Sequence, residues 1–307
     1  MRRPLAALLA LALPLAACTR HSDPERPAAP AERTGLTVLA AGSTPRRVLR
    51  VGLVEGATTT LAVTVSLGLT QDGGATSIPV RTPTVTEEVR FRVDDTGPDG
   101  ATVSFEIADA RLDRSGTDLT DLEFVRLTAA VQQVVGVRGT AVVPPSGSAT
   151  RLRLHAPAGA APEVLATLDQ LEQQLGRLVP PLPRVAVGRG ARWRVTETLR
   201  SGGVVVDRTT TYRVVALTGS RVDYEAEVRQ EARPDRGAGP STSAGPAAEL
   251  VTATVSGTTT GHFSLGDLAS SSTTSLRGTQ QVRTTDGDAS STATQRLTLR
   301  VTVAPSG

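Results

Sequence analysis

The sequence of 307 residues contains no lysine and no asparagine, and it has only one cysteine, three histidines and seven aromatic residues. Without lysine the chain cannot form a Schiff base, build a P-loop or use a Ser–Lys dyad. One cysteine excludes an intrachain disulfide and a cysteine-rich zinc site. Seven aromatic side chains are too few for a platform on which nucleic-acid bases stack.

The basic character of the chain comes from arginine alone. Its 33 arginines face 30 acidic residues, and the pI is about 9.9 because arginine keeps its charge far above the pH at which lysine loses its own. The first 17 residues hold two arginines and no acid, so their removal leaves 31 arginines against 30 acids, a net charge of +1. Nucleic-acid binding needs clustered surplus charge, so we expect no nucleic-acid partner.

The N-terminal segment predicts a secretory signal peptide over residues 1–17. Arg2 and Arg3 precede a run of 13 residues, Leu5–Ala17, that is apolar and interrupted only by Pro14. As a helix this run would be about 20 Å long, which is too short to cross a hydrocarbon core of about 30 Å. A basic start, a short apolar stretch and small residues at its end are typical of an exported protein.

Four residues at the end of this segment resemble the lipobox of bacterial lipoproteins: Leu15, Ala16, Ala17 and Cys18. The resemblance implies that a diacylglyceryl group is attached to the Cys18 sulfur, that the chain is cleaved before Cys18, and that the acyl chains anchor it in a membrane. Position 19 is Thr rather than the Asp of inner-membrane lipoproteins, which favours the outer membrane in a bacterium that has one. An ordinary secretory peptide with a stray cysteine is the alternative.

The rest of the chain divides into a tether and a β-rich domain. Residues 18–34 are polar and rich in proline, which predicts a disordered tether after the lipidated cysteine. Residues 35–307 show long stretches of alternating apolar and polar positions. They predict a mainly β domain, a large curved antiparallel sheet or half-barrel with one apolar and one wet face. A short helix is predicted over residues 119–134.

Two further features organise this domain. Leucines at helical spacing follow Pro162 and stop before Pro180, so we predict an amphipathic helix over residues 162–179 that packs on the concave face of the sheet. The chain also looks duplicated, with pseudo-repeats at about 46–160 and 183–305 joined by this helix. Chance similarity between alternating strands is the competing explanation for the repeat.

The segment from Pro183 to Trp193 is similar to a Val-Gly-x-Gly-Ala-x-Trp strand opening of β-rich, uncharacterised lipoproteins of bacterial envelopes. Together with the lipobox, the tether and the meanders, this resemblance implies an envelope lipoprotein. An antiparallel sheet curled around a helix is also similar in architecture to the half-barrel carriers of lipoproteins and glycolipids, a likeness that does not by itself establish function.

Residues that could carry chemistry are scattered along the chain. His21, His155 and His262 lack metal-ligand spacing, no G-x-S-x-G elbow occurs, and the acidic turns lack the EF-hand pattern. Successive residues of a strand face opposite sides, so Glu87 and Glu88 do not converge into an acid–base pair. We therefore predict no catalytic residue, no metal site and no cofactor.

Three functions remain open. The first is a non-enzymatic, membrane-anchored envelope lipoprotein with a binding or scaffold role. The second is a carrier that holds a lipid or another amphiphile in the half-barrel, which requires space that the helix over 162–179 does not fill. The third is a hydrolase whose Ser, His and Asp residues are assembled by the fold, with His155 or His262 as the base.

Overall fold

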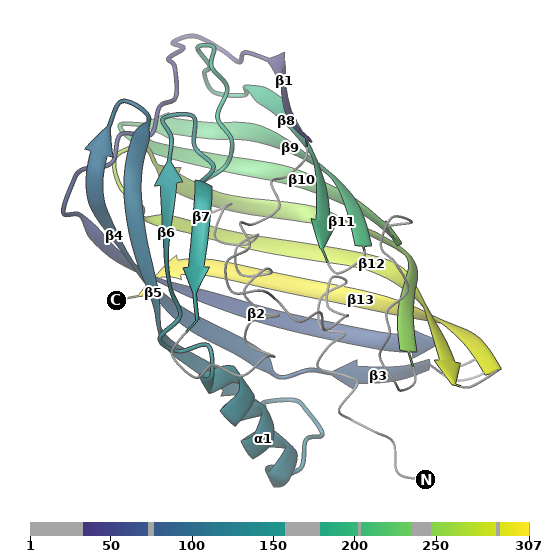
Figure 1. Ribbon diagram of the computed structural model, residues 1–307. Helices are drawn as coiled ribbons and strands as arrows, with labels where there is room; N and C mark the ends of the chain where they lie inside the picture. The colour runs from purple at the N-terminus through teal and green to yellow at the C-terminus, as the bar shows by residue number, and fades with distance from the viewer. Residues whose placement is uncertain are drawn as a thin grey trace.

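The computed structural model describes residues 33–72, 77–156, 179–201, 204–234, 247–286 and 289–306, which form one antiparallel sheet and one helix (Figure 1). The mainly β prediction is confirmed, because 13 strands join in a single open, curved sheet. The second predicted helix, over residues 162–179, lies outside the described ranges except for its last residue, Val179.

The strands are long, as the extended alternating stretches of the sequence predicted. In chain order the elements are β1 (Arg33–Ala40), β2 (Thr58–Asp72), β3 (Ser77–Arg81), β4 (Thr84–Gly97), β5 (Gly100–Asp113), α1 (Asp121–Gln132), β6 (Arg138–Val143), β7 (Thr150–His155), β8 (Arg192–Ser201), β9 (Val204–Thr218), β10 (Arg221–Pro234), β11 (Ala247–Ser264), β12 (Ser270–Asp286) and β13 (Ala289–Pro305).

Two meanders meet in the middle of the sheet. Strands β8 to β13 pair in chain order, and β2, β4, β5, β6 and β7 pair in chain order beside them, while β3 pairs with β2 alone. The junction between the meanders is β13 against β2, where Leu299 lies opposite Leu67. Strands β1 and β7 are the two edges of this order, so the described strands form a half-barrel rather than a closed barrel.

Strand β1 was not predicted, and neither was β3. Strand β1 begins at Arg33, just inside the range predicted for the tether, and has eight residues. It pairs with β8, so that Leu36 lies opposite Val195. A run this short carries little periodicity of its own, and its extended conformation depends on a partner strand that is remote in the sequence.

Glycines on the concave side of β11 and β12 allow neighbouring backbones to approach closely. A Cβ atom on Gly257 would lie 1.9 Å from the main-chain oxygen of Ser275, and one on Gly278 would lie 2.1 Å from that of Thr254. Only hydrogen fits at these two positions. Glycine inside a strand typically marks a tight bend of this kind, and here it lets the sheet curl around its concave face.

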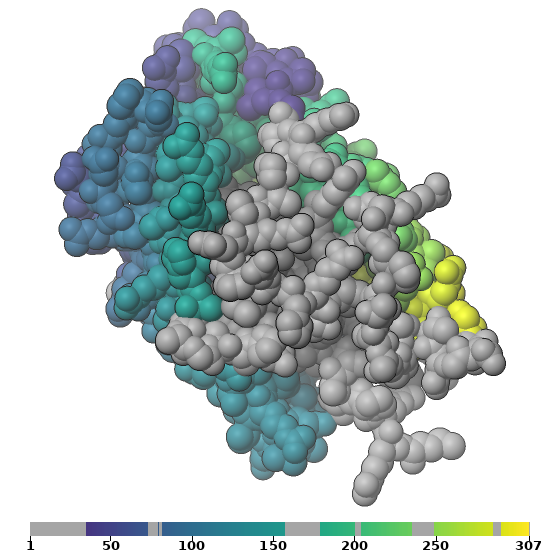
Figure 2. Space-filling model, in the orientation of Figure 1, coloured from purple at the N-terminus to yellow at the C-terminus, as the bar shows by residue number. Residues whose placement is uncertain are grey.

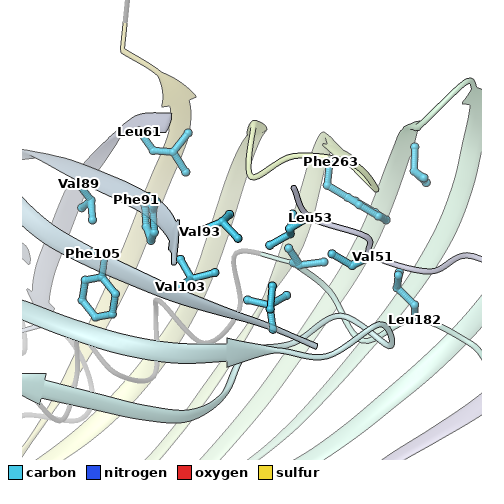
Figure 3. Packing of buried hydrophobic residues seen from close by; sticks show 14 of the residues in the cluster. Val51, Leu53, Leu61, Val89, Phe91, Val93, Val103, Phe105, Leu182 and Phe263 are labelled. Carbon is cyan, nitrogen blue, oxygen red and sulfur yellow. The ribbon is translucent and has the colours of Figure 1, made fainter. Parts of the chain in front are cut away.

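Residues 41–57 close one end of the half-barrel. This segment leaves the edge strand β1 and crosses the end of the sheet to reach β2 in its middle (Figure 1). On the way the Val51 N–H donates to the Pro145 carbonyl at 2.9 Å, and the Gly52 N–H donates to the Leu265 carbonyl at 2.7 Å. Three of its side chains are buried in the core: Leu49, Val51 and Leu53. Figure 3 labels Val51 and Leu53 among the core side chains.

Two turns at this closed end have the same geometry. Gly56 precedes β2 and Gly190 precedes β8, and both have a φ of 78°. The Gly56 N–H donates to the Val93 carbonyl and the Gly190 N–H donates to the Val214 carbonyl, each at 2.9 Å. The matching bonds agree with the predicted pseudo-repeat, which itself stays a prediction.

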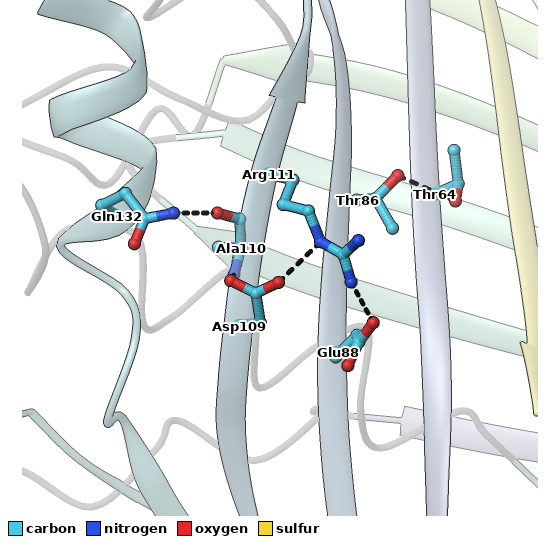
Figure 4. A network of polar contacts seen from close by, with 7 residues as sticks. All are labelled: Thr64, Thr86, Glu88, Asp109, Ala110, Arg111 and Gln132. Atoms are coloured by element: carbon cyan, nitrogen blue, oxygen red, sulfur yellow. Dashed lines mark hydrogen bonds and ion pairs between the residues drawn. The ribbon is translucent and has the colours of Figure 1, made fainter. Parts of the chain in front are cut away.

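Helix α1 projects from the opposite, open end of the sheet, after β5 (Figures 1 and 2). The sequence predicted a helix here, and a capping box starts it: the Thr120 hydroxyl accepts from the Glu123 N–H, and the Glu123 carboxylate accepts from the Thr120 N–H. The Gln132 side chain donates to the Ala110 carbonyl of β5 (Figure 4). No residue of α1 is fully buried.

Candidate functional site: the concave face of the sheet

The alternation of each strand decides which side chains face inward. In β10, Val222 and Val228 are buried, whereas Glu225 and Glu227 are exposed. The antiparallel register extends this division to the neighbouring strands, because residues directly opposite each other lie on the same face. The predicted apolar and wet faces are therefore confirmed, and the apolar face is the concave one (Figure 3).

The convex face is covered by ion pairs and hydroxyls. Arg111 binds both Glu88 and Asp109, the latter with its Nε at 2.6 Å from Oδ2, and the Thr64 and Thr86 hydroxyls lie 3.1 Å apart (Figure 4). Surface pairs of this kind contribute little to stability. Their charges are satisfied by each other, so they do not point to a ligand.

Four aromatic residues form a ladder near the closed end. Trp193, Tyr212, Tyr224 and Phe263 come from β8, β9, β10 and β11, with successive ring centroids 5.3, 5.9 and 5.7 Å apart. The Trp193 side chain is fully buried, and its indole N–H donates to the Pro181 carbonyl at 2.9 Å. Burial raises the pKa of Tyr224, so its phenol stays neutral.

A second apolar group, the apolar band, lies farther along the concave face. It spans β2, β10, β11, β12 and β13 and does not belong to the core at the closed end. Its members are Leu67, Leu69, Val228, Val255, Leu276, Leu297 and Leu299. The band is therefore contributed by both meanders, and it lies across the junction between them.

Three polar residues, the polar row, interrupt the concave face on the β8 side. Glu197 on β8, Arg208 on β9 and Gln230 on β10 lie directly opposite one another in the register. The Arg208 Nε is buried and has no hydrogen-bond partner. The row separates the core at the closed end from a third apolar cluster: Leu199, Val206, Ala232 and Ala253.

A glutamine pair lies on the β12 side of the same face. Gln280 is only 3 % exposed, and its Nε2 donates to Oε1 of Gln295 on β13 at 2.7 Å. Each amide thus has a partner in the neighbouring strand. The next pair of residues on the same face, toward the closed end, is Gly278 of β12 and Leu297 of β13. The glutamine pair is therefore closer to the open end than Leu297.

Glu87 is the acidic residue that the fold places in an apolar setting. It lies opposite Val63 of β2 and Ala110 of β5, and burial raises its pKa to about 7. Its neighbour Glu88 points to the convex face and binds Arg111, so the prediction that Glu87 and Glu88 do not converge is confirmed. The inward place of Glu87 was missed, although it occupies the same strand face as Val89.

One small enclosed space and one open depression are lined by described residues. One space of about 30 Å³ is lined by the core side chains of β4 to β7, Phe91 and Phe105 among them, whereas ligand pockets typically have about 300 Å³ or more. An open depression of about 470 Å³ lies around Arg111, whose charge is already paired. No cluster of three or more potential metal ligands occurs in the described ranges.

The predicted site residues do not come together here. Cys18, the other lipobox residues and His21 precede the described part of the chain. His155 is exposed at the end of the edge strand β7, and His262 lies on the convex side of β11, opposite Asp223. The two histidines that the hydrolase hypothesis offered as alternative bases therefore lie on separate parts of the sheet.

Comparisons with known proteins give little further guidance. No family model matches the chain, and no curated protein matches its sequence. A crystal structure of an outer membrane channel from Pseudomonas putida F1 aligns with 82% of this chain and 97% of that one, at 10% identity and a TM-score of 0.14. A TM-score this low does not establish a shared fold. Within the described ranges, no helix is long and apolar enough to span a membrane.

Proposed function

We propose that the protein is a non-enzymatic envelope lipoprotein, anchored through Cys18, that binds the apolar chain of an amphiphile on its concave face. The observation that carries the proposal is the apolar band, which is separate from the core at the closed end. The lipobox residues Leu15, Ala16 and Ala17 support the anchor, and Thr19 supports the outer membrane in a two-membrane envelope.

The physical argument starts from the single layer of the sheet. An apolar sheet face must be covered by another apolar surface, and residues 41–57 supply one at the closed end. Six members of the apolar band are themselves only 1–8 % exposed, so the chain of an amphiphile has to gain access to buried side chains. Each methylene group of an acyl chain that is buried there contributes about 0.8 kcal/mol. The predicted helix over 162–179 is the competing cover, so the function requires that an amphiphile gain access to the band in its presence.

The band makes a direct prediction for binding. Leu299→Gln should weaken the binding of a fluorescent long-chain fatty alcohol by about 10-fold or more, because it removes roughly 1.5–3 kcal/mol of apolar burial. The adjacent Arg300→Gln, on the convex side of β13, is the matched control and should leave binding unchanged. Both variants are compared with the wild type by fluorescence titration, after circular dichroism shows that each is folded. Equal affinity of all three proteins, or no binding by the wild type, would contradict the concave site.

The anchor makes a second prediction. Cys18→Ser should abolish the incorporation of radiolabelled fatty acid and release the protein into the soluble fraction, because the serine hydroxyl cannot form the thioether. Thr19→Ser is the control and should stay labelled and membrane-bound. Label that persists in the Cys18→Ser variant would show that the protein is not anchored in this way.

A further inference from the structure

Arg208 occupies an unusual place for a cation. The inward positions of β9 on either side of it are Val206 and Thr210, both buried, so the guanidinium rises from the concave face rather than from the wet face. Its Nε is buried without a hydrogen-bond partner, and no ion pair joins Arg208 to any residue in the described ranges. Arg208 as a whole is half-buried. A buried N–H group without a partner is costly, so such a group normally has one.

The neighbours of Arg208 do not supply that partner. Glu197 lies directly opposite on β8, yet the two side chains form no ion pair; Glu197 has an interaction of its own. On the other side lies Gln230, whose neutral amide cannot compensate the charge. Arg208 therefore keeps donors that a ligand can use.

The position of Arg208 relative to the apolar band suggests what that ligand is. Gln230 of β10 pairs with Arg208 of β9 on one side and with Val255 of β11 on the other. Val228 is the next residue of β10 that faces the same side. Both valines belong to the band, so the guanidinium lies at the border of an apolar surface. A molecule that is apolar along its length and negatively charged at one end matches this arrangement.

We infer that Arg208 binds the anionic headgroup, a carboxylate or a phosphate, of an amphiphile whose chain covers the apolar band. The inference rests on the proposed function and adds the headgroup to it. The planar guanidinium presents two parallel N–H donors that match the oxygens of either group. Binding would give the buried Nε–H group a partner.

The test uses the mature, lipidated protein in detergent and three probes of equal chain length: a fatty alcohol, a fatty acid and an alkyl phosphate. Arg208→Met keeps the length of the side chain and removes its charge. It should leave the affinity for the alcohol unchanged and weaken the binding of at least one anionic probe by about 10- to 100-fold. The anionic probe whose affinity falls more identifies carboxylate or phosphate as the natural group.

Arg213→Met is the matched control, because Arg213 lies on the convex side of the same strand with its Nη1 3.4 Å from Oε2 of Glu225. It should change none of the three affinities. Thermal unfolding separates ligand binding from a structural role: without probe, Arg208→Met should be at least as stable as the wild type, and only the wild type should gain stability from the anionic probe.

The outcomes distinguish the two proposals. Three results would show that the headgroup site is wrong while binding of the chain stands. Arg208→Met could weaken the binding of all three probes equally, leave all three affinities unchanged, or destabilise the unliganded protein. If the wild type binds no probe, the proposed function fails and the headgroup site fails with it. Selective loss of the anionic probes in Arg208→Met alone supports the inference.

Discussion

Replacing Trp193 by alanine is expected to lower the free energy of unfolding by about 3–5 kcal/mol, the range measured when large aromatic residues are removed from cores. The side chain is fully buried, stacks on Tyr212 with ring centroids 5.3 Å apart, and bonds to the Pro181 carbonyl. Alanine would leave a cavity and strip a carbonyl of its donor. Urea denaturation followed by circular dichroism measures the change.

Two further variants separate the contributions to this effect. Trp193→Phe keeps a ring against Tyr212 but loses the hydrogen bond, so its loss of stability should be intermediate. Phe124→Ala is the control, because Phe124 lies on α1 and contacts the Arg114 guanidinium, 5.3 Å from the ring centroid, outside the ladder. If Trp193→Ala destabilised the protein no more than Phe124→Ala, the ladder would not be part of the stable core.

Replacing Glu87 by glutamine is expected to remove a pH dependence of stability. Burial raises the pKa of Glu87 from 4.5 to about 7, so the folded state favours the neutral carboxyl. This contribution is fully present below about pH 4.5 and is lost as the pH rises through 7. The free energy of unfolding of the glutamine variant minus that of the wild type should therefore be about 3 kcal/mol larger at pH 8 than at pH 4.

The measurement is the free energy of unfolding of both proteins from urea titrations at several values between pH 4 and pH 8. Glu88→Gln is the matched control, since Glu88 is the next residue of β4 but binds Arg111 on the convex face. It should show no such gain with rising pH. A constant difference between wild type and Glu87→Gln across the whole range would mean that Glu87 is not buried in solution.

A consequence for the concave face follows from Glu87 and Arg208 together. The former lies on β4 and the latter on β9, in different meanders, and both depart from the apolar character of their surroundings. Polar groups at apolar positions reduce stability unless they have partners. We propose ligand binding as the reason for Arg208, and the Arg208→Met experiment tests that proposal.

Much of the architecture could be predicted from local patterns. The alternation in the range 60–70 predicted β2, and proline and glycine placed the turns that separate the long strands. Thr120 and Glu123 make up the capping box that starts α1. Such features depend on residues close in the chain, so their physical causes are visible in the sequence. The short strand β1 depends instead on pairing with β8, and no local pattern predicted it.

The candidate site was harder to predict, although part of its signal was present. Arg208 lies in register with Val206 and Thr210, and Glu87 lies in register with Val89, so the period of two already placed both on apolar faces. A single charged residue in an alternating stretch gave no reason to expect burial, because a long side chain can reach water. Only the pairing of each strand with its neighbours shows that both side chains are half-buried on the concave face.

The sequence by itself determined that this chain is mainly β, that its strands have one apolar face, and that Cys18 is the expected anchor, because alternation and the lipobox are local. The tertiary structure alone decided that β13 joins β2, that residues 41–57 close one end, and that Glu197, Arg208 and Gln230 form one row. Register and curvature depend on contacts between residues far apart in the chain, and those contacts create the concave face.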